Sequence, residues 1–201
     1  MHGGAVAAIV ITVLILAGWI GYLMYYFTRS TICGVDTKTA NASSTFLGRE
    51  GVGLDKLFDG NPNTGWHSKT DVYREDGSAK TQVTDLTVDK KVSPGQWITC
   101  ELHPCKSGTI YGYTMQERKW QNGYGIGHPK SWTIIASYDK GDTWQTVQKD
   151  DKDEWMGKLK MTLKNPVSDA THIGIIVHSV SGTSMVPNPT FCSFHGLDFH
   201  C

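Results

Sequence analysis

The sequence lacks an excess of charge of either sign. Its 201 residues contain 19 lysines and arginines against 19 aspartates and glutamates. Binding to nucleic acid or to an anionic membrane surface through bulk charge needs a positive excess, so the balance gives no reason to predict either partner. The sequence also lacks a G-x-S-x-G motif, an H-E-x-x-H motif and a phosphate-binding glycine loop, and its carboxylates are scattered. We therefore predict a protein that is not an enzyme.

After residue 42 the sequence also lacks internal repeats, low-complexity tracts and convincing amphipathic helices. Short alternating runs separated by turn residues take their place, as in residues 171–180, where Ile173, Ile175 and Val177 fall on one side. A period of two is typical of a strand with one buried face. We predict strands over residues 96–102, 109–115, 132–137, 143–147, 171–180 and 191–201, and one all-β sandwich or barrel.

The N-terminal part contains a long uncharged run, residues 5–27. About 20 apolar residues suffice for a helix to span a bilayer, and Trp19 with the tyrosines after it resembles an interfacial aromatic belt. The alternative is a cleaved signal peptide, but no basic segment precedes the run and no small-residue cleavage site follows it. We predict a transmembrane anchor over residues 1–28, a polar connector over residues 29–42 and the folded domain over residues 43–201.

The orientation of this anchor is indicated by residues that follow it. Arg29 favours a cytoplasmic C-terminal side. All five cysteines and the sequon Asn41-Ala42-Ser43 favour the opposite side, because disulfides and N-glycans form outside the reducing cytoplasm. We expect a single-pass membrane protein whose C-terminal domain lies outside the cytoplasm or in a virion membrane.

Four segments, taken in order, resemble the discoidin family, also called the coagulation-factor C-type or galactose-binding-like domain. They are LFDGNPNTGWHS after the small-residue stretch ANASS, GQWITCEL, HPKSWTIIASYDKGDTW and the C-terminal GLDFHC. The resemblance covers about residues 33–201. It implies a jelly-roll β-sandwich or barrel that binds ligands through loops at one end.

The resemblance also implies a disulfide between the first and last cysteines of the domain, Cys33 and Cys201. Cys100 and Cys105 are separated by four residues that end in Pro104, which favours a turn and a second bridge. Cys192 is then left over, either as a free buried thiol or as part of an intermolecular bridge.

A calcium site is a further implication of the resemblance. In many family members the turn that corresponds to residues 58–66 binds calcium, which prefers six to eight oxygen ligands. The ligands expected here are Asp59, Asn61, Thr64 and Asp198, although Leu197 stands at the usual position of the family's closing-strand glutamate. The alternative is a plain turn in which Asp59 and Asn61 cap their own backbone.

Two loops have the side chains that bind sugars. The loop of residues 67–92 is longer than expected for the family and contains Tyr73 and Arg74; the loop of residues 116–130 contains Arg118, Trp120, Asn122, Tyr124 and His128. Aromatic rings stack on sugar C–H groups and polar side chains bind the hydroxyls. We expect Arg118, Trp120, Tyr124 and His128 on one exposed loop; the alternative is that Trp120 and Tyr124 pack beneath it.

These features predict a membrane-anchored, non-catalytic module that binds glycans or another surface ligand, with calcium as its one candidate cofactor. The alternative is a structural, membrane-linked component of an assembly such as a virion or capsid, in which the sandwich makes protein–protein contacts.

Overall fold

The computed structural model of the protein describes a defined part of the chain. It covers residues 18–19, 33–46, 48, 50–81, 85–103, 108–120, 123–124, 126–153, 155–182 and 189–201, without the side chains of residues 119–120 and 123–124. The chain divides into two compact units, Met1–Thr31 and Ile32–Cys201. The strands of the described residues all belong to the second unit.

The predicted anchor falls almost wholly outside the described residues. Only Gly18 and Trp19 are described, and both are helical. None of the helices in the described part of the chain has the length and apolar character that crossing a bilayer requires. The predicted single-pass membrane localisation is therefore corrected. An uncharged run by itself meets only the compositional requirement of a span.

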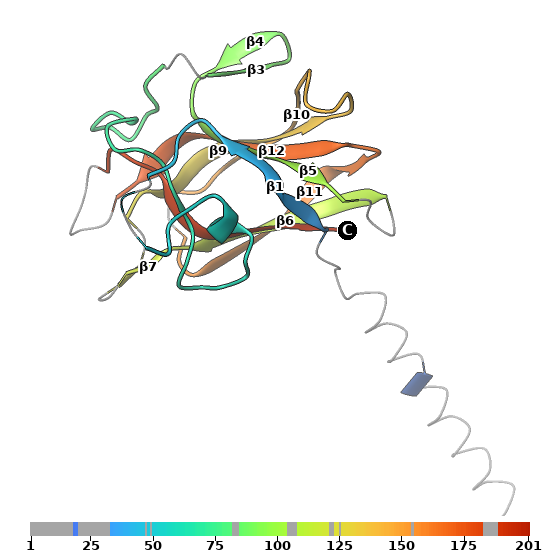
Figure 1. Ribbon diagram of the computed structural model, residues 1–201, viewed down its shortest axis with the longest axis horizontal. Coiled ribbons are helices and arrows are strands. Elements are labelled where there is room, and N and C mark those ends of the chain that lie inside the picture. The colour runs from blue at the N-terminus through green and yellow to red at the C-terminus, as the bar shows by residue number, and fades with distance from the viewer. Residues whose placement is uncertain are drawn as a thin grey trace, which may run out of the picture. The chain divides into compact units, whose positions relative to one another are not determined.

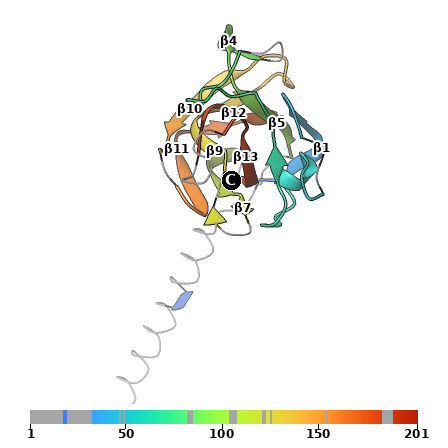
Figure 2. The same cartoon turned by 90° about the vertical axis from the view of Figure 1, so that its left-hand side faces the viewer.

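Two antiparallel sheets form the second unit (Figures 1 and 2). One contains, in spatial order, β1 (Val35–Ala42), β5 (Gln96–Leu102), β12 (His172–Ser181), β9 (His128–Ser137) and β10 (Gln145–Asp151). The other contains β11 (Lys158–Ser168), β6 (Thr109–Glu117), β13 (Ser193–His200) and β2 (Trp66–His67). The predicted all-β sandwich is confirmed.

Among the described residues of the second unit, the smaller elements are two hairpins and one helical turn. The hairpins are β3 (Leu86–Val88) with β4 (Lys91–Ser93), and β7 (Lys119–Trp120) with β8 (Gly123–Tyr124). The 3-10 helix η1 (Asp55–Leu57) precedes the turn that leads into β2.

The core lies between the two sheets and follows the alternation of the sequence. In β12, Ile173, Ile175 and Val177 are completely buried, and Ile134 of β9 lies opposite Ile175. The four-stranded sheet contributes aromatic side chains, among them Phe199. Each fully buried side chain of this size contributes about 1.5–3 kcal/mol through removal from water.

A second apolar cluster lies on the other side of the five-stranded sheet. Ile135 and Ile176 alternate with the core residues, yet both are completely buried. They pack with Val88 of the β3–β4 hairpin and with Trp144. The hairpin, seen above the five-stranded sheet in Figure 1, therefore covers part of this outer face.

Strand β1 corrects the predicted domain boundary. The polar composition of residues 35–42 predicts a connector, but these residues form the edge strand of the five-stranded sheet and pair with β5. An edge strand needs only one neighbour and tolerates exposed polar side chains such as Lys38, so its composition resembles that of a linker.

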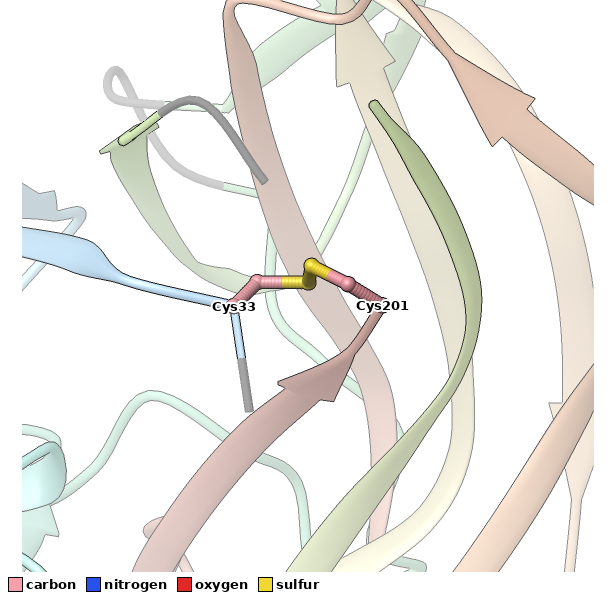
Figure 3. Close-up of a disulfide and its surroundings, with 2 residues drawn as sticks. All are labelled: Cys33 and Cys201. Carbon is pink, nitrogen blue, oxygen red and sulfur yellow. A yellow bond between two sulfur atoms is a disulfide. The ribbon is translucent and has the colours of Figure 1, made fainter. Parts of the chain in front are cut away.

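The disulfide between Cys33 and Cys201 is present, as Figure 3 shows. Their Cα atoms are 5.5 Å apart and the bond closes a sequence separation of 168 residues. The Cys33 N–H also donates to the carbonyl of Phe199 at 2.7 Å. The bond therefore joins the start of β1 to the end of β13.

The predicted bridge between Cys100 and Cys105 is corrected. Cys100 is a free thiol buried in β5, and burial raises its pKa to about 12. It occupies the core-facing side of the strand with Ile98, which directs it away from the turn that follows; Cys105 itself lies outside the described residues. Of the two alternatives for Cys192, the structure shows the free buried thiol.

Candidate functional site

Several segments that are distant in the sequence meet at one end of the sandwich, which we call the loop end. The N–H of Phe46 donates to the carbonyl of His67 at 2.8 Å, and that of Ser193 donates to the carbonyl of Gly127 at 2.8 Å. The loop end is thus built from the residues before β2, the end of β2, the β6–β9 connection and the start of β13. Because β13 runs from Ser193 to the disulfide, the loop end and the disulfide lie at opposite ends of this strand.

Two rings form the centre of the loop end. The imidazole of His67 stacks on the phenyl ring of Phe191, with centroids 4.2 Å apart and planes inclined by 21°. The ring of Phe46 lies on His67 at 5.3 Å and remains 36% exposed. His67 is buried, whereas Phe191 is half-buried. This arrangement presents apolar ring surface to solvent at the sheet's end.

Gly127 allows the β6–β9 connection to approach Phe191 closely. Its φ is +75°, and a Cβ at this position would lie 2.4 Å from the carbonyl oxygen of Phe191. No other residue fits there without displacing the backbone. The N–H of Gly127 donates to the carbonyl of Ser181 at 3.1 Å, so the connection is anchored to the end of β12 as well.

Buried polar groups support the base of the β7–β8 hairpin. Glu117 is 1% exposed; its Oε2 accepts the N–H of Gly157 at 2.9 Å and its Oε1 lies 3.5 Å from Nδ1 of His128. Burial raises the pKa of Glu117. Arg118, beside it, donates to Oγ of Ser193 at 3.4 Å. These contacts fix both ends of the connection that carries the hairpin.

The structure corrects the expected exposure of several predicted ligand-binding residues. Arg118 and His128 are 7% and 6% exposed, because each has a protein partner at the hairpin base. Tyr73 is completely buried, and its hydroxyl donates to the carbonyl of Val177 at 2.9 Å. Tyr73 is therefore a core residue and presents no surface to a ligand.

The remaining predicted residues divide between exposed and undescribed positions. Arg74 is exposed and donates to the carbonyl of Ala79 at 2.9 Å. The backbones of Trp120 and Tyr124 lie in β7 and β8, but their side chains, and all of Asn122, lie outside the described residues.

His67 and Phe191 are site residues that the sequence does not predict. Both adjoin residues of recognisable motifs: His67 follows Trp66 of the aspartate–glycine turn, and Phe191 precedes Cys192. Their aromatic side chains are the sequence feature that could have identified them as candidates. Their pairing depends on the contact of β2 with β13, which no local pattern indicates.

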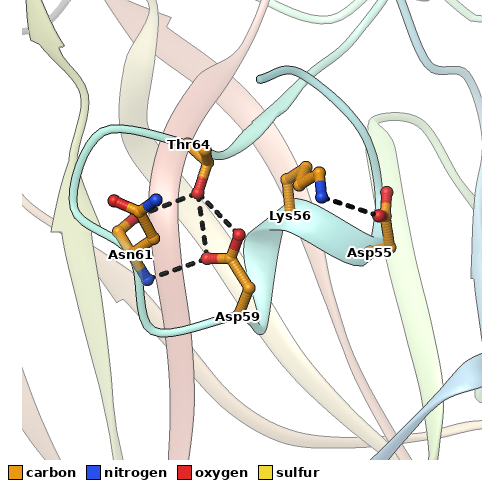
Figure 4. A network of polar contacts seen from close by, with 5 residues as sticks. All are labelled: Asp55, Lys56, Asp59, Asn61 and Thr64. Atoms are coloured by element: carbon orange, nitrogen blue, oxygen red, sulfur yellow. Dashed lines mark hydrogen bonds and ion pairs between the residues drawn. The ribbon is translucent and has the colours of Figure 1, made fainter. Parts of the chain in front are cut away.

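The turn before β2 is closed by its own hydrogen bonds (Figure 4). The carboxylate of Asp59 accepts the N–H of Asn61 at 2.8 Å and the hydroxyl of Thr64 at 2.7 Å. Oδ1 of Asn61 accepts the N–H of Asn63 at 3.0 Å. The turn thus gathers several oxygens on an exposed surface, and Asp59, Asn61 and Thr64 could hold a calcium ion.

Asp198 is not brought to this turn. Strand β13 meets the turn at Phe194, which pairs with Trp66, whereas Asp198 pairs with Thr114. Four residues of extended strand separate Asp198 from Phe194 by about 13 Å. The β13 residue that reaches the turn is His195, whose Nδ1–H donates to the carbonyl of Pro62 at 2.7 Å. Asp198 is therefore the one predicted calcium ligand that the structure corrects.

The sequence matches no protein-family model and no curated protein. Solved structures do match. A family 32 carbohydrate-binding module from Clostridium perfringens, in complex with GalNAc-β-1,3-galactose, is 21% identical with a TM-score of 0.54, over 81% of this chain and 94% of that one. The family 32 module of C. perfringens NanJ, in complex with galactose, is 19% identical with a TM-score of 0.52, over 85% of this chain and 100% of that one.

An F5/8 type C domain from Bacteroides fragilis is 12% identical with a TM-score of 0.53, over 84% of this chain and 95% of that one. The fold is discoidin-like. At these identities the likeness concerns the arrangement of the strands, and the predicted fold is confirmed at that level.

Proposed function

We propose that this protein is a non-catalytic module that binds glycans at its loop end. The observation that carries the proposal is the His67–Phe191 ring pair at the end of a discoidin-like sandwich. Two solved structures with this fold hold galactose or GalNAc-β-1,3-galactose. The partly exposed ring of Phe191 suits the apolar C–H face of such sugars.

The loop end offers a sugar both apolar and polar contacts. Phe191 and Phe46 supply apolar ring surface, and the backbone of the β7–β8 hairpin belongs to the connection that reaches the same end. Arg118 and His128 act beneath the surface and hold the hairpin base in place. A rigid base reduces the entropy lost when a sugar binds.

A glycan array probed with the full chain tests the proposal. We expect binding to glycans that end in galactose or N-acetylgalactosamine. Trp120→Ala and Phe191→Ala should each weaken it about tenfold, since an aromatic anchor carries much of the energy of a small interface. The matched control is Tyr138→Ala, because Tyr138 is 46% exposed and follows β9 at the end opposite His128.

Two results would contradict the proposal: a folded chain that binds no glycan, or an equal loss in the Tyr138 control. The alternative function, a structural component of an assembly, is favoured by none of the described contacts, and we do not propose it.

A further inference from the structure

A groove lies outside the sandwich core, beside the β3–β4 hairpin. It consists of two adjoining hollows of about 500 and 450 Å³ that share Thr133, Lys149 and His178. The first lies against the hairpin on the outer face of the five-stranded sheet, and the second continues over β10 towards β11. The loop-end residues His67 and Phe191 do not line either hollow.

The hairpin wall of the groove is fixed to the sheet. The N–H of Asp89 donates to the carbonyl of Trp144 at 3.0 Å, and the carboxylate of Asp89 accepts the N–H of Thr146 at 3.3 Å. At the other end, Nδ1 of His178 lies 2.8 Å from the carbonyl of Pro94. Val88 is buried between these anchors. The groove is therefore formed before any ligand arrives.

The floor of the groove is neutral and internally hydrogen-bonded. A carbonyl can only accept, so Nδ1 of His178 carries the proton towards Pro94, and Nε2 accepts the hydroxyl of Thr133 at 2.7 Å. Burial lowers the pKa of His178, which keeps the imidazole uncharged at neutral pH. The hydroxyls of Ser131 and Ser179 pair at 2.6 Å. The floor supplies polar surface without charge.

The rim carries the charge. Four lysines line the two hollows, and none forms an ion pair with another residue in the described part of the chain: Lys91, Lys149, Lys152 and Lys164. Of the three lining aspartates, two are engaged within the protein. Asp89 accepts from Thr146, and Asp150 accepts the hydroxyl of Tyr113 at 2.5 Å and the amide of Gln148 at 2.8 Å. Asp151 is the third, so four lysines face three aspartates, and the lining has one more positive than negative charge, which favours an anion.

The other lining groups narrow the class of ligand. Of the two rings that line the groove, Trp132 is 1% exposed and His178 is held by hydrogen bonds at both ring nitrogens, so the lining favours polar contacts over the stacking of a neutral sugar. A peptide would need an open strand edge or an apolar pocket. Strands β9 and β12 are paired on both sides within the sheet, but β10 is its edge strand, so a peptide is a competing occupant that a poly-glutamate ligand tests. Lysine ammonium groups along a polar groove suit repeated sulfate or carboxylate groups.

We propose that this groove binds a linear anionic polysaccharide, of the sulfated or uronic-acid class, at a site separate from the loop end. The joined hollows extend over more than one strand, which suits a chain rather than a single sugar. The β3–β4 hairpin forms one wall of this site. The proposal therefore gives a role to the C-terminal part of the long segment 67–92, whereas the loop end uses only its first residue, His67.

The test is a titration of the full chain with dextran sulfate, with unsulfated dextran and poly-glutamate as comparison ligands. We expect dextran sulfate to bind and the other two to bind at least about tenfold more weakly. Lys91→Gln with Lys149→Gln should weaken dextran sulfate binding about tenfold. The matched control is Lys158→Gln with Lys160→Gln, which removes the same charge from exposed positions on β11.

Three further outcomes would each overturn the proposal. Equal losses in the two double variants would show binding by bulk charge. Equal binding of poly-glutamate would show that any polyanion, peptides included, is accepted. Loss of dextran sulfate binding in Phe191→Ala would place the site at the loop end. If Phe191→Ala loses neutral glycan binding but keeps dextran sulfate binding, the two sites are separate, and the inference stands independently of the proposed function.

Discussion

The indole N–H of Trp132 donates a hydrogen bond to the hydroxyl of Tyr113 at 2.8 Å, between strand β9 of one sheet and strand β6 of the other. Both side chains are buried, and the Tyr113 hydroxyl in turn donates to Asp150. Burial and the neighbouring carboxylate raise the pKa of Tyr113. The two sheets are therefore joined by a polar chain as well as by apolar packing.

Tyr113→Phe should lower the free energy of unfolding by about 1–3 kcal/mol, because the buried N–H of Trp132 loses its acceptor. Urea denaturation measures the change. Tyr111→Phe, two residues away and 50% exposed, is the control and should leave stability within about 0.5 kcal/mol of the wild type. Equal stability of the two variants would show that the link contributes nothing.

Removal of the disulfide should destabilise the domain. Cys33→Ser with Cys201→Ser should lower the free energy of unfolding by about 3–5 kcal/mol, since the bond closes a very long loop of the unfolded chain. Denaturation with and without reductant measures this. The double variant should not respond to reductant, and alkylation of both cysteines in the unreduced native protein would disprove the bond.

Calcium binding is a proposal that concerns the turn of residues 59–64. We propose that Asp59, Asn61 and Thr64 hold the ion without Asp198. Calcium added to EDTA-treated protein should then raise the melting temperature, and Asp59→Ala should abolish the rise. Asp198→Asn is the control and should keep it. A melting temperature that does not change with calcium would contradict the proposal. The turn would then be stabilised by its internal hydrogen bonds alone.

Asp139 should make stability fall in acid. Hydrogen bonds from the hydroxyl and N–H of Thr143, and then from Ser137, lower its pKa from 3.8 to about 2. A carboxyl whose pKa is lower in the folded state contributes stability above pH 3.8, and this contribution disappears as the pH falls towards 2.

Denaturation midpoints at several pH values between 6 and about 2 test this linkage. Asp139→Asn should lose less stability than the wild type over that range. Asp142→Asn, in the same turn, keeps the hydrogen bonds of Asp139 and should retain the wild-type acid loss. An unchanged acid loss in Asp139→Asn would assign the effect to other groups.

The sequence predicts the core strands better than the edges. The alternation of Ile173, Ile175 and Val177 identifies one buried face, and that face is the one in the core. The same run includes Ile176, whose burial depends on a hairpin from a distant segment, so periodicity alone could not predict a covered outer face. The edge strand β1 was not predicted, because its polar composition is also typical of a connector.

The sequence predicts the candidate site less well, because the burial of its residues depends on contacts with residues that are distant in the sequence. Arg118 and His128 are expected to be exposed because they belong to a glycine-rich segment between two strands, which has little apolar mass to bury. Their burial depends on Ser193 and Glu117, and the relevant contacts form only when β6, β9 and β13 come together. The stacking of His67 on Phe191 depends in the same way on long-range pairing.

The covalent bond between residues 33 and 201 also has a mechanical meaning. A pull applied between these two residues acts across Cα atoms only 5.5 Å apart that are joined through their sulfur atoms. Such tension is carried by the disulfide and does not shear one strand past another. The sandwich can then keep its loops in shape while the chain is under load, and reduction of this one bond would transfer the same force to the hydrogen bonds of β1 and β13.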